Sequence, residues 1–126
     1  MDAIIEHPEE YLEFFRLFNE GEYYDAHEVL EDLWVIEVQP LKDYYKGLIQ
    51  AAAAILHWER GNLSGARKLY QRSRDVLSPY PDFYEGFALG AFRDDMEALF
   101  GPLLDDTTTL APVLDKERIP RLGVEG

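Results

Sequence analysis

The chain has 126 residues, of which 47% are hydrophobic and 13% aromatic, enough for one domain with a proper core. Its formal net charge of −13 argues against nucleic acid and anionic membranes as partners, because phosphate binding needs Lys and Arg. It has no cysteine, hence no disulfide and no thiolate metal site. Neither an apolar run of about 18 residues nor a signal-like start is present, and we expect a cytoplasmic protein without a membrane span.

Helical periodicity dominates the first hundred residues. Apolar positions at helical spacing predict four helices, over about residues 8–18, 22–38, 41–59 and 63–77. Pro40 ends the second of these helices, and Asn62 is expected to cap the fourth. A fifth helix is predicted over about 82–100, because Asp82 and Glu85 form a start that is similar to a capping box.

The alternation typical of strands is missing, so the sequence predicts an all-α fold, a compact bundle of about five helices built from helical hairpins. Proline, threonine and glycine punctuate the chain after Gly101. We therefore expect a helical-bundle domain over residues 1–101 and a non-helical tail over residues 102–126. The apolar residues of the tail are expected to lie across the domain or across a second subunit: Leu103, Leu104, Leu110, Val113, Leu114 and Ile119.

A weak internal repeat relates two predicted hairpins. Residues 20–26 align with residues 60–66 at a shift of 40, and the shift matches Gly21 with Gly61 and a small alanine with another alanine. A glycine at a hairpin turn, followed by a small residue where two helices approach, is typical of tetratricopeptide-type hairpins. The period is longer than the usual 34 or so and only two units are visible, which favours a bundle over an extended solenoid.

The predicted helix over 22–38 carries a dense polar motif. At about 100° per residue, His27 and Trp34 face the core, and Glu31 lies beside His27 at i+4, on the border of the apolar face. Glu28 lies at the edge of that face. The motif therefore presents a histidine and carboxylates toward a neighbouring helix.

The predicted helix over 41–59 is apolar almost all round, which is typical of a central, buried helix. Its polar residues fall on one stripe, formed by Lys46, Gln50 and His57. A buried polar group without a partner costs about 1–3 kcal/mol, so this stripe requires polar neighbours. We expect His27 or Glu28 to lie within hydrogen-bonding reach of the stripe.

Three interpretations of this constellation remain open. In the first, a polar network only fixes the register of the two helices. In the second, the alanines at 51–54 leave room for a small-molecule ligand. In the third, His27 and Glu31 bind a divalent metal and His57 or Glu28 completes the site. The His-Glu-x-x-Glu segment differs from the zinc-protease motif at its last ligand, and Lys46 would bring a positive charge beside the metal.

Three segments form a recognisable combination: FNEGEYYDAHEVLEDLW from Phe18, YKGLIQAAAAILH from Tyr45, and Gly61-Asn62 with Gly65-Ala66-Arg67. Together they resemble the signature of a small bacterial and archaeal family known as domain of unknown function 309. The resemblance implies a compact all-helical fold and supplies no reaction. Seven residues stand where the family motif has them: His27, Glu28, Glu31, Trp34, Lys46, Gln50 and His57.

The sequence favours a non-catalytic ligand- or protein-binding module with a buried polar network between its second and third helices. No Ser or Thr lies in a nucleophile-elbow or phosphate-loop context. The alternative is a metal-dependent enzyme, of the hydrolase type, that uses His27, Glu28, Glu31 and His57. No cofactor is predicted apart from the divalent metal of that alternative. The expected partner is a small molecule, another protein or a second copy of the chain.

Overall fold

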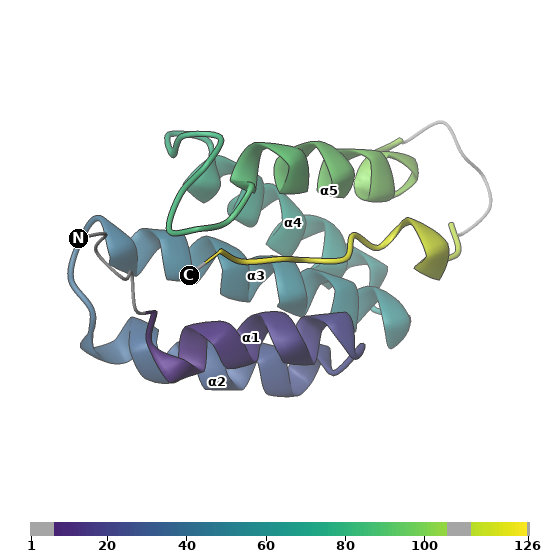
Figure 1. Cartoon of the computed structure of the whole chain (residues 1–126). Helices are drawn as coiled ribbons and strands as arrows, with labels where there is room; N and C mark the ends of the chain where they lie inside the picture. The colour runs from purple at the N-terminus through teal and green to yellow at the C-terminus, as the bar shows by residue number, and fades with distance from the viewer. Residues whose placement is uncertain (1–6, 106–111, 126) are drawn as a thin grey trace, which may run out of the picture.

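The computed structural model describes residues 7–105 and 112–125 (Figure 1). Its helices are α1 (Glu9–Asn19), α2 (Tyr23–Ile36), α3 (Leu41–Glu59), α4 (Leu63–Leu77), α5 (Leu89–Leu104) and the short 3₁₀ helix η1 (Lys116–Arg118). Within these residues, extended pairing is limited to isolated bridges that Phe87 forms with Tyr84 and Val124. The all-α prediction is therefore confirmed. None of the helices in the described ranges has the length and apolar character needed to cross a membrane.

The internal repeat is visible in the backbone as two similar hairpins, α1–α2 and α3–α4. Gly21 and Gly61 both have φ of +80°, a left-handed conformation that favours glycine. Each glycine amide donates a 3.0 Å hydrogen bond to a carbonyl in the last turn of the preceding helix. Ala26 and Ala66, five residues later, are fully buried. The repeated small residues therefore allow both the tight turn and the close approach of the helices.

Helix α3 lies at the centre of the bundle, between α2 and α4, with α1 on one side and α5 on the other (Figure 1). Ten of its residues are buried, as its apolar pattern predicts. Its closest approach is to α4, where the Ser73 hydroxyl donates a 2.7 Å hydrogen bond to the carbonyl of Gly47. Asn62 caps α4 as predicted, because its side chain accepts a 3.0 Å hydrogen bond from the amide of Gly65.

The predicted start of the fifth helix at Asp82 is wrong, because α5 begins at Leu89. The backbone carbonyl of Asp82 instead accepts a hydrogen bond from the amide of Gly90, at 2.8 Å. Glu85 and Gly86 adopt positive φ angles, which no helix can continue. Residues 78–88 therefore form a folded loop at one end of the bundle.

The predicted end of the bundle at Gly101 is also corrected, since α5 continues through Pro102 to Leu104. Leu103 is buried, and its packing holds the last turn although proline normally ends a helix. The segment 112–125 was expected to be a non-helical tail, yet it includes η1. Leu110 lies outside the described residues.

The C-terminal segment packs across the domain, between α1 and α5 (Figure 1). Asn19 of α1 and Leu122 exchange two hydrogen bonds of 2.7 Å, and Leu122 is buried. The amide of Glu125 then donates a 2.7 Å hydrogen bond to the carbonyl of Gly86 in the folded loop. One of the two expected positions of the tail, across its own domain, is thus observed. Leu114 and Ile119 pack on the core, whereas Val113 is exposed.

Candidate binding site

His27 of α2 makes its contacts within its own helix. Its Nδ1 lies 2.6 Å from the carbonyl oxygen of Tyr24, which can only accept, so Nδ1 carries the proton. Its Nε2 faces the carboxylate of Glu31 at 3.5 Å, as the i+4 spacing predicted. Glu28 is exposed on the outer side of α2. The motif is therefore a local arrangement at the surface of one helix.

Trp34 closes the turn between α2 and α3. The ammonium group of Lys42 lies 4.5 Å from the centre of the Trp34 ring and donates a 2.6 Å hydrogen bond to the Trp34 carbonyl. The indole nitrogen is buried without a hydrogen-bond partner among the described residues. Lys46, expected on the inward stripe, is exposed, because the side of α3 that carries it faces solvent.

Gln50 and His57, the other two residues of the stripe, do not reach α2. The Gln50 side-chain oxygen is buried and accepts no hydrogen bond from any described residue. Nδ1 of His57 accepts a 2.9 Å hydrogen bond from the side-chain amide of Asn62, the residue that caps α4. His57 thus supports the turn between α3 and α4.

Within residues 7–105 and 112–125, neither His27 nor Glu28 forms a hydrogen bond or ion pair with Lys46, Gln50 or His57, and the bond from Lys42 to the Trp34 carbonyl is the observed polar link between α2 and α3. The side-chain contacts of His27 and His57 stay within α2 or close the following turn. Of the candidate metal ligands, His27 and Glu31 lie side by side and His57 does not join them, since no group of three or more His, Cys, Asp or Glu among the described residues could hold a metal ion. Helical spacing predicts which face of a helix carries each residue. It does not predict how deeply that face is buried against the neighbouring helices.

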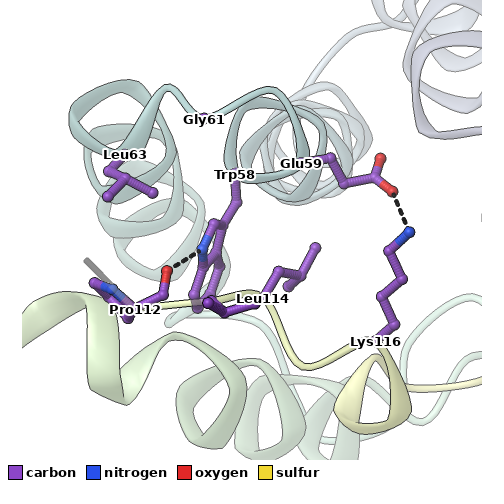
Figure 2. A pocket seen from close by; sticks show the side chains of 8 residues that line it. Trp58, Glu59, Gly61, Leu63, Pro112, Leu114 and Lys116 are labelled. Carbon is purple, nitrogen blue, oxygen red and sulfur yellow. Dashed lines mark hydrogen bonds and ion pairs between the residues drawn. The ribbon is translucent and has the colours of Figure 1, made fainter. Parts of the chain in front are cut away.

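An open groove of about 400 Å³ lies between the α3–α4 turn and the C-terminal segment (Figure 2). The Trp58 indole forms its wall and donates a 3.0 Å hydrogen bond to the carbonyl of Pro112. Lys116 reaches Glu59 at 3.8 Å on the other side. The Trp58 indole N–H and the Glu59 carboxylate are thus already paired with the C-terminal segment, which forms the other wall of the groove.

A second groove, of about 470 Å³, opens at the opposite end of α3. We call it the tyrosine–proline groove, and its lining residues are Gln39, Pro40, Asp43, Val76, Pro79, Tyr80, Pro81 and Tyr84. They come from the α2–α3 turn with the first turn of α3, from the end of α4 and from the folded loop. Three segments distant in sequence therefore meet at one surface rich in proline and tyrosine.

Three tyrosine rings build one side of this groove. Tyr44, fully buried below it, lies 5.7 Å from the ring of Tyr80 and 4.8 Å from that of Tyr84. Tyr80 and Tyr84 meet edge to face at 5.1 Å. Burial and the nearby Asp43 carboxylate raise the pKa of Tyr80, and burial and Glu85 raise the pKa of Tyr84. Both phenols thus stay neutral hydrogen-bonding groups.

Arg93 of α5 holds the loop that carries the groove. Its guanidinium donates hydrogen bonds of 2.9 Å and 2.8 Å to the carbonyls of Leu77 and Tyr80. It also pairs with the Asp82 carboxylate at 2.8 Å. One side chain therefore fixes both ends of the turn that contains Pro79 and Pro81. Such bracing preserves the shape of the groove.

Exposed apolar side chains lie close in sequence to the lining residues. At the end of α2, Val35 and Ile36 are exposed by 65% and 77%, and Val38 in the following turn is exposed by 69%. Phe83 of the folded loop, next to the lining residue Tyr84, is 56% exposed. Apolar side chains gathered on a surface mark sites of interaction with other molecules.

The tyrosine–proline groove was not predicted from the sequence, because some of its residues were assigned to predicted helices and the others to the segments between them. The Ser78-Pro79-Tyr80-Pro81 run was identified only as a loop. Its alternation of proline with an aromatic residue was the available signal. Arg93 carried no signal, because the segment before it was predicted as helix.

Residues 11–69 match the family described as "Domain of unknown function (DUF309)". The chain is 37% identical over 86 residues to an uncharacterized protein of Aquifex aeolicus (strain VF5), a match that covers 67% of this chain and 26% of that protein. It is 33% identical over 73 residues to the uncharacterized protein YpuF of Bacillus subtilis (strain 168), covering 56% of this chain and 42% of the relative. The chain thus spans less than half the length of these two curated relatives. No solved structure matches it.

Proposed function

On the premise that residues 11–69 of this chain belong to the DUF309 family, we propose that the protein is a non-catalytic binding module. The tyrosine–proline groove is its binding surface, and the ligand is an extended segment of a partner protein. The observation that carries this proposal is the groove of about 470 Å³ whose walls are braced before any ligand arrives. A braced groove loses little conformational entropy on binding.

The composition of the groove supports a protein ligand. Tyrosine offers a large apolar ring and a polar tip at a low entropy cost, and it is enriched where proteins meet. Tyr80 and Tyr84 are both partly exposed while their rings rest on the buried Tyr44. The exposed Val38 and Phe83 are the sequence neighbours of the lining residues Gln39 and Tyr84. An elongated ligand would contact both the groove and these neighbours.

The groove lacks the features of a catalytic centre. Its titratable side chains are Asp43, Tyr80 and Tyr84. The raised pKa values of the two tyrosines work against ionisation, so neither phenol is activated as a nucleophile or a general base. The enzyme alternative relied on His27, Glu28, Glu31 and His57, and among the described residues only the pair His27 and Glu31 is brought together, without a third ligand.

Selection of short random peptides displayed on phage, followed by nuclear magnetic resonance with the ¹⁵N-labelled full chain, tests this proposal. We expect enriched peptides to shift the amide signals of Gln39, Asp43, Val76 and Tyr84. Tyr84→Ala should weaken binding, whereas Tyr24→Ala, which removes a half-exposed tyrosine on α2, should leave it unchanged. Peptides that shift the signals of α2 or the α3–α4 turn instead would overturn the proposal, as would a selection that enriches nothing.

A further inference from the structure

Resting on the proposed function, we infer that the bound segment is a polyproline II stretch with a Lys or Arg beside its prolines. The rings of Tyr80 and Tyr84 receive the prolines, and the carboxylate of Asp43 receives the cation. The groove combines aromatic rings, hydrogen-bond donors and the carboxylate of Asp43, which has no ion-pair partner among the described residues. The rings suit the prolines, the donors suit the backbone carbonyls, and the carboxylate suits the cation.

The ring geometry suits proline. Tyr80 and Tyr84 meet edge to face at an interplanar angle of 61°, and both rings line the groove and are partly exposed. Grooves lined by aromatic residues bind proline-rich segments, because a polyproline II helix is already extended and loses little entropy when it docks. Pro40 and Pro81 add rigid apolar edges to the same surface.

Two hydrogen-bond donors in the groove match the backbone of such a segment. A polyproline II helix makes no internal hydrogen bonds, so its carbonyl groups are free to accept. The Gln39 side-chain oxygen accepts from the amide of Asp43 at 3.0 Å, which leaves the Gln39 amide nitrogen facing away from that bond. Neither this nitrogen nor the Tyr84 hydroxyl is paired within the described residues.

The charge of the groove selects a cationic segment. Asp43 is exposed and forms no ion pair with any basic group of residues 7–105 and 112–125. No Lys or Arg lines the groove. The whole chain carries a net charge of −13, so a second copy of it would be repelled, whereas a basic segment is attracted.

The test uses short synthetic peptides with two prolines separated by two residues. An arginine stands before or after the prolines, because a polyproline II segment can dock in either direction. One matched peptide replaces both prolines by alanine, and another replaces arginine by glutamate. Binding to the full-length protein is measured by isothermal titration calorimetry, at low and at high salt.

We expect the loss of both prolines to weaken binding by at least about fivefold. Replacing arginine by glutamate should weaken it by about two- to fivefold, and high salt should reduce this difference. In the Asp43→Asn variant the two peptides should bind alike. Glu22→Gln, which removes an exposed carboxylate before α2, is the matched control and should retain the difference.

The failure of this inference differs from the failure of the proposed function. If the phage selection yields peptides that bind the groove without proline, or if Asp43→Asn leaves the preference for arginine intact, the inference is overturned and the binding module stands. If no selected peptide contacts the groove, both are overturned.

Discussion

The hydroxyl of Tyr80 donates a hydrogen bond to the carbonyl of Pro40, which joins the folded loop to the turn between α2 and α3 across forty residues of sequence. The same ring packs against Tyr44 and Tyr84. The tyrosine–proline groove thus has two walls that are tied together at one point. Its shape depends on a contact between segments that sequence reasoning treated separately.

Removing this contact should loosen the groove without unfolding the protein. Tyr80→Phe keeps the ring and deletes the hydrogen bond, so we expect the free energy of unfolding to fall by about 0.5–1.5 kcal/mol. Urea denaturation measures the change. Tyr24→Phe on α2 is the control and should change stability less, since Tyr24 is half exposed. An equal loss in both variants would show that the Tyr80 contact contributes no more than a surface hydroxyl.

Arg93 should matter more than any exposed arginine. Arg93→Gln removes a charged group that binds two carbonyls and Asp82, and we expect a loss of about 1.5–3 kcal/mol of stability. Arg72→Gln, at an exposed position of α4, should change it by less than about 0.5 kcal/mol. Denaturation of the two variants side by side checks this. Similar stabilities would mean that Arg93 does not brace the loop.

The sequence was sufficient to predict the helical hairpins, and the reason is local. Gly21, Gly61 and the cap Asn62 act through their own backbone geometry, and the apolar period of α3 depends on burial along one element. The start of α5 could not be predicted in this way. Asp82 and Glu85 have the spacing of a capping box, but the contacts of Asp82 with Gly90 and Arg93 determine the conformation of this segment.

The candidate site residues likewise divide into those that local helix geometry places and those that the packing of the helices places. The pairing of His27 with Glu31 follows from helical spacing, and it was predicted. The exposure of Lys46 and the bond of His57 to Asn62 depend on how α2, α3 and α4 are rotated against one another. Periodicity gives the face of a helix but not the depth at which that face packs. The tyrosine–proline groove depends on how the α2–α3 turn, the end of α4 and the folded loop pack against one another.

Gln50 should be replaceable by an apolar residue. Its side-chain oxygen is buried without a partner among the described residues, which costs about 1–3 kcal/mol. We expect Gln50→Leu to retain the helical circular dichroism spectrum and to raise the melting temperature. A lower melting temperature would contradict this expectation and would indicate that the Gln50 oxygen is satisfied in solution.

Helices α3 and α4 approach closely at Gly47. A β-carbon at this position would lie 2.4 Å from Cγ and Cδ2 of Leu77, which is itself buried. We therefore expect Gly47→Ala to destabilise the protein by about 1–3 kcal/mol. Lys46→Ala, at an exposed position of the same helix, also places an alanine on α3 and should change stability by less than about 0.5 kcal/mol. Thermal unfolding of both variants compares steric crowding with helix propensity, and a stabilised Gly47→Ala would contradict the packing.

Buried tyrosines should make stability fall at high pH. Burial raises the pKa of Tyr23 to about 12 and that of Tyr45 to about 12, whereas an unfolded tyrosine ionises near pH 10. Between these values the unfolded chain loses protons that the folded chain keeps. The contribution of these two tyrosines to the free energy of unfolding is therefore constant below about pH 10 and falls above it, by up to about 1.4 kcal/mol per pH unit for each group.

Urea denaturation across this range measures the slope, and Tyr45→Phe should reduce the slope by the contribution of one tyrosine. Tyr24→Phe is the comparison: Glu28 raises the pKa of Tyr24, but this side chain is half exposed, so the variant should reduce the slope less than Tyr45→Phe does. A slope that Tyr45→Phe does not change would show that Tyr45 ionises equally in both states.

The central claim, that the tyrosine–proline groove binds an extended partner segment, is tested most directly by intermolecular nuclear Overhauser effects in a complex with a selected peptide. We predict contacts from the peptide to ring protons of Tyr80 and Tyr84. Contacts to the rings of His27 or Trp58 in their place would contradict the claim.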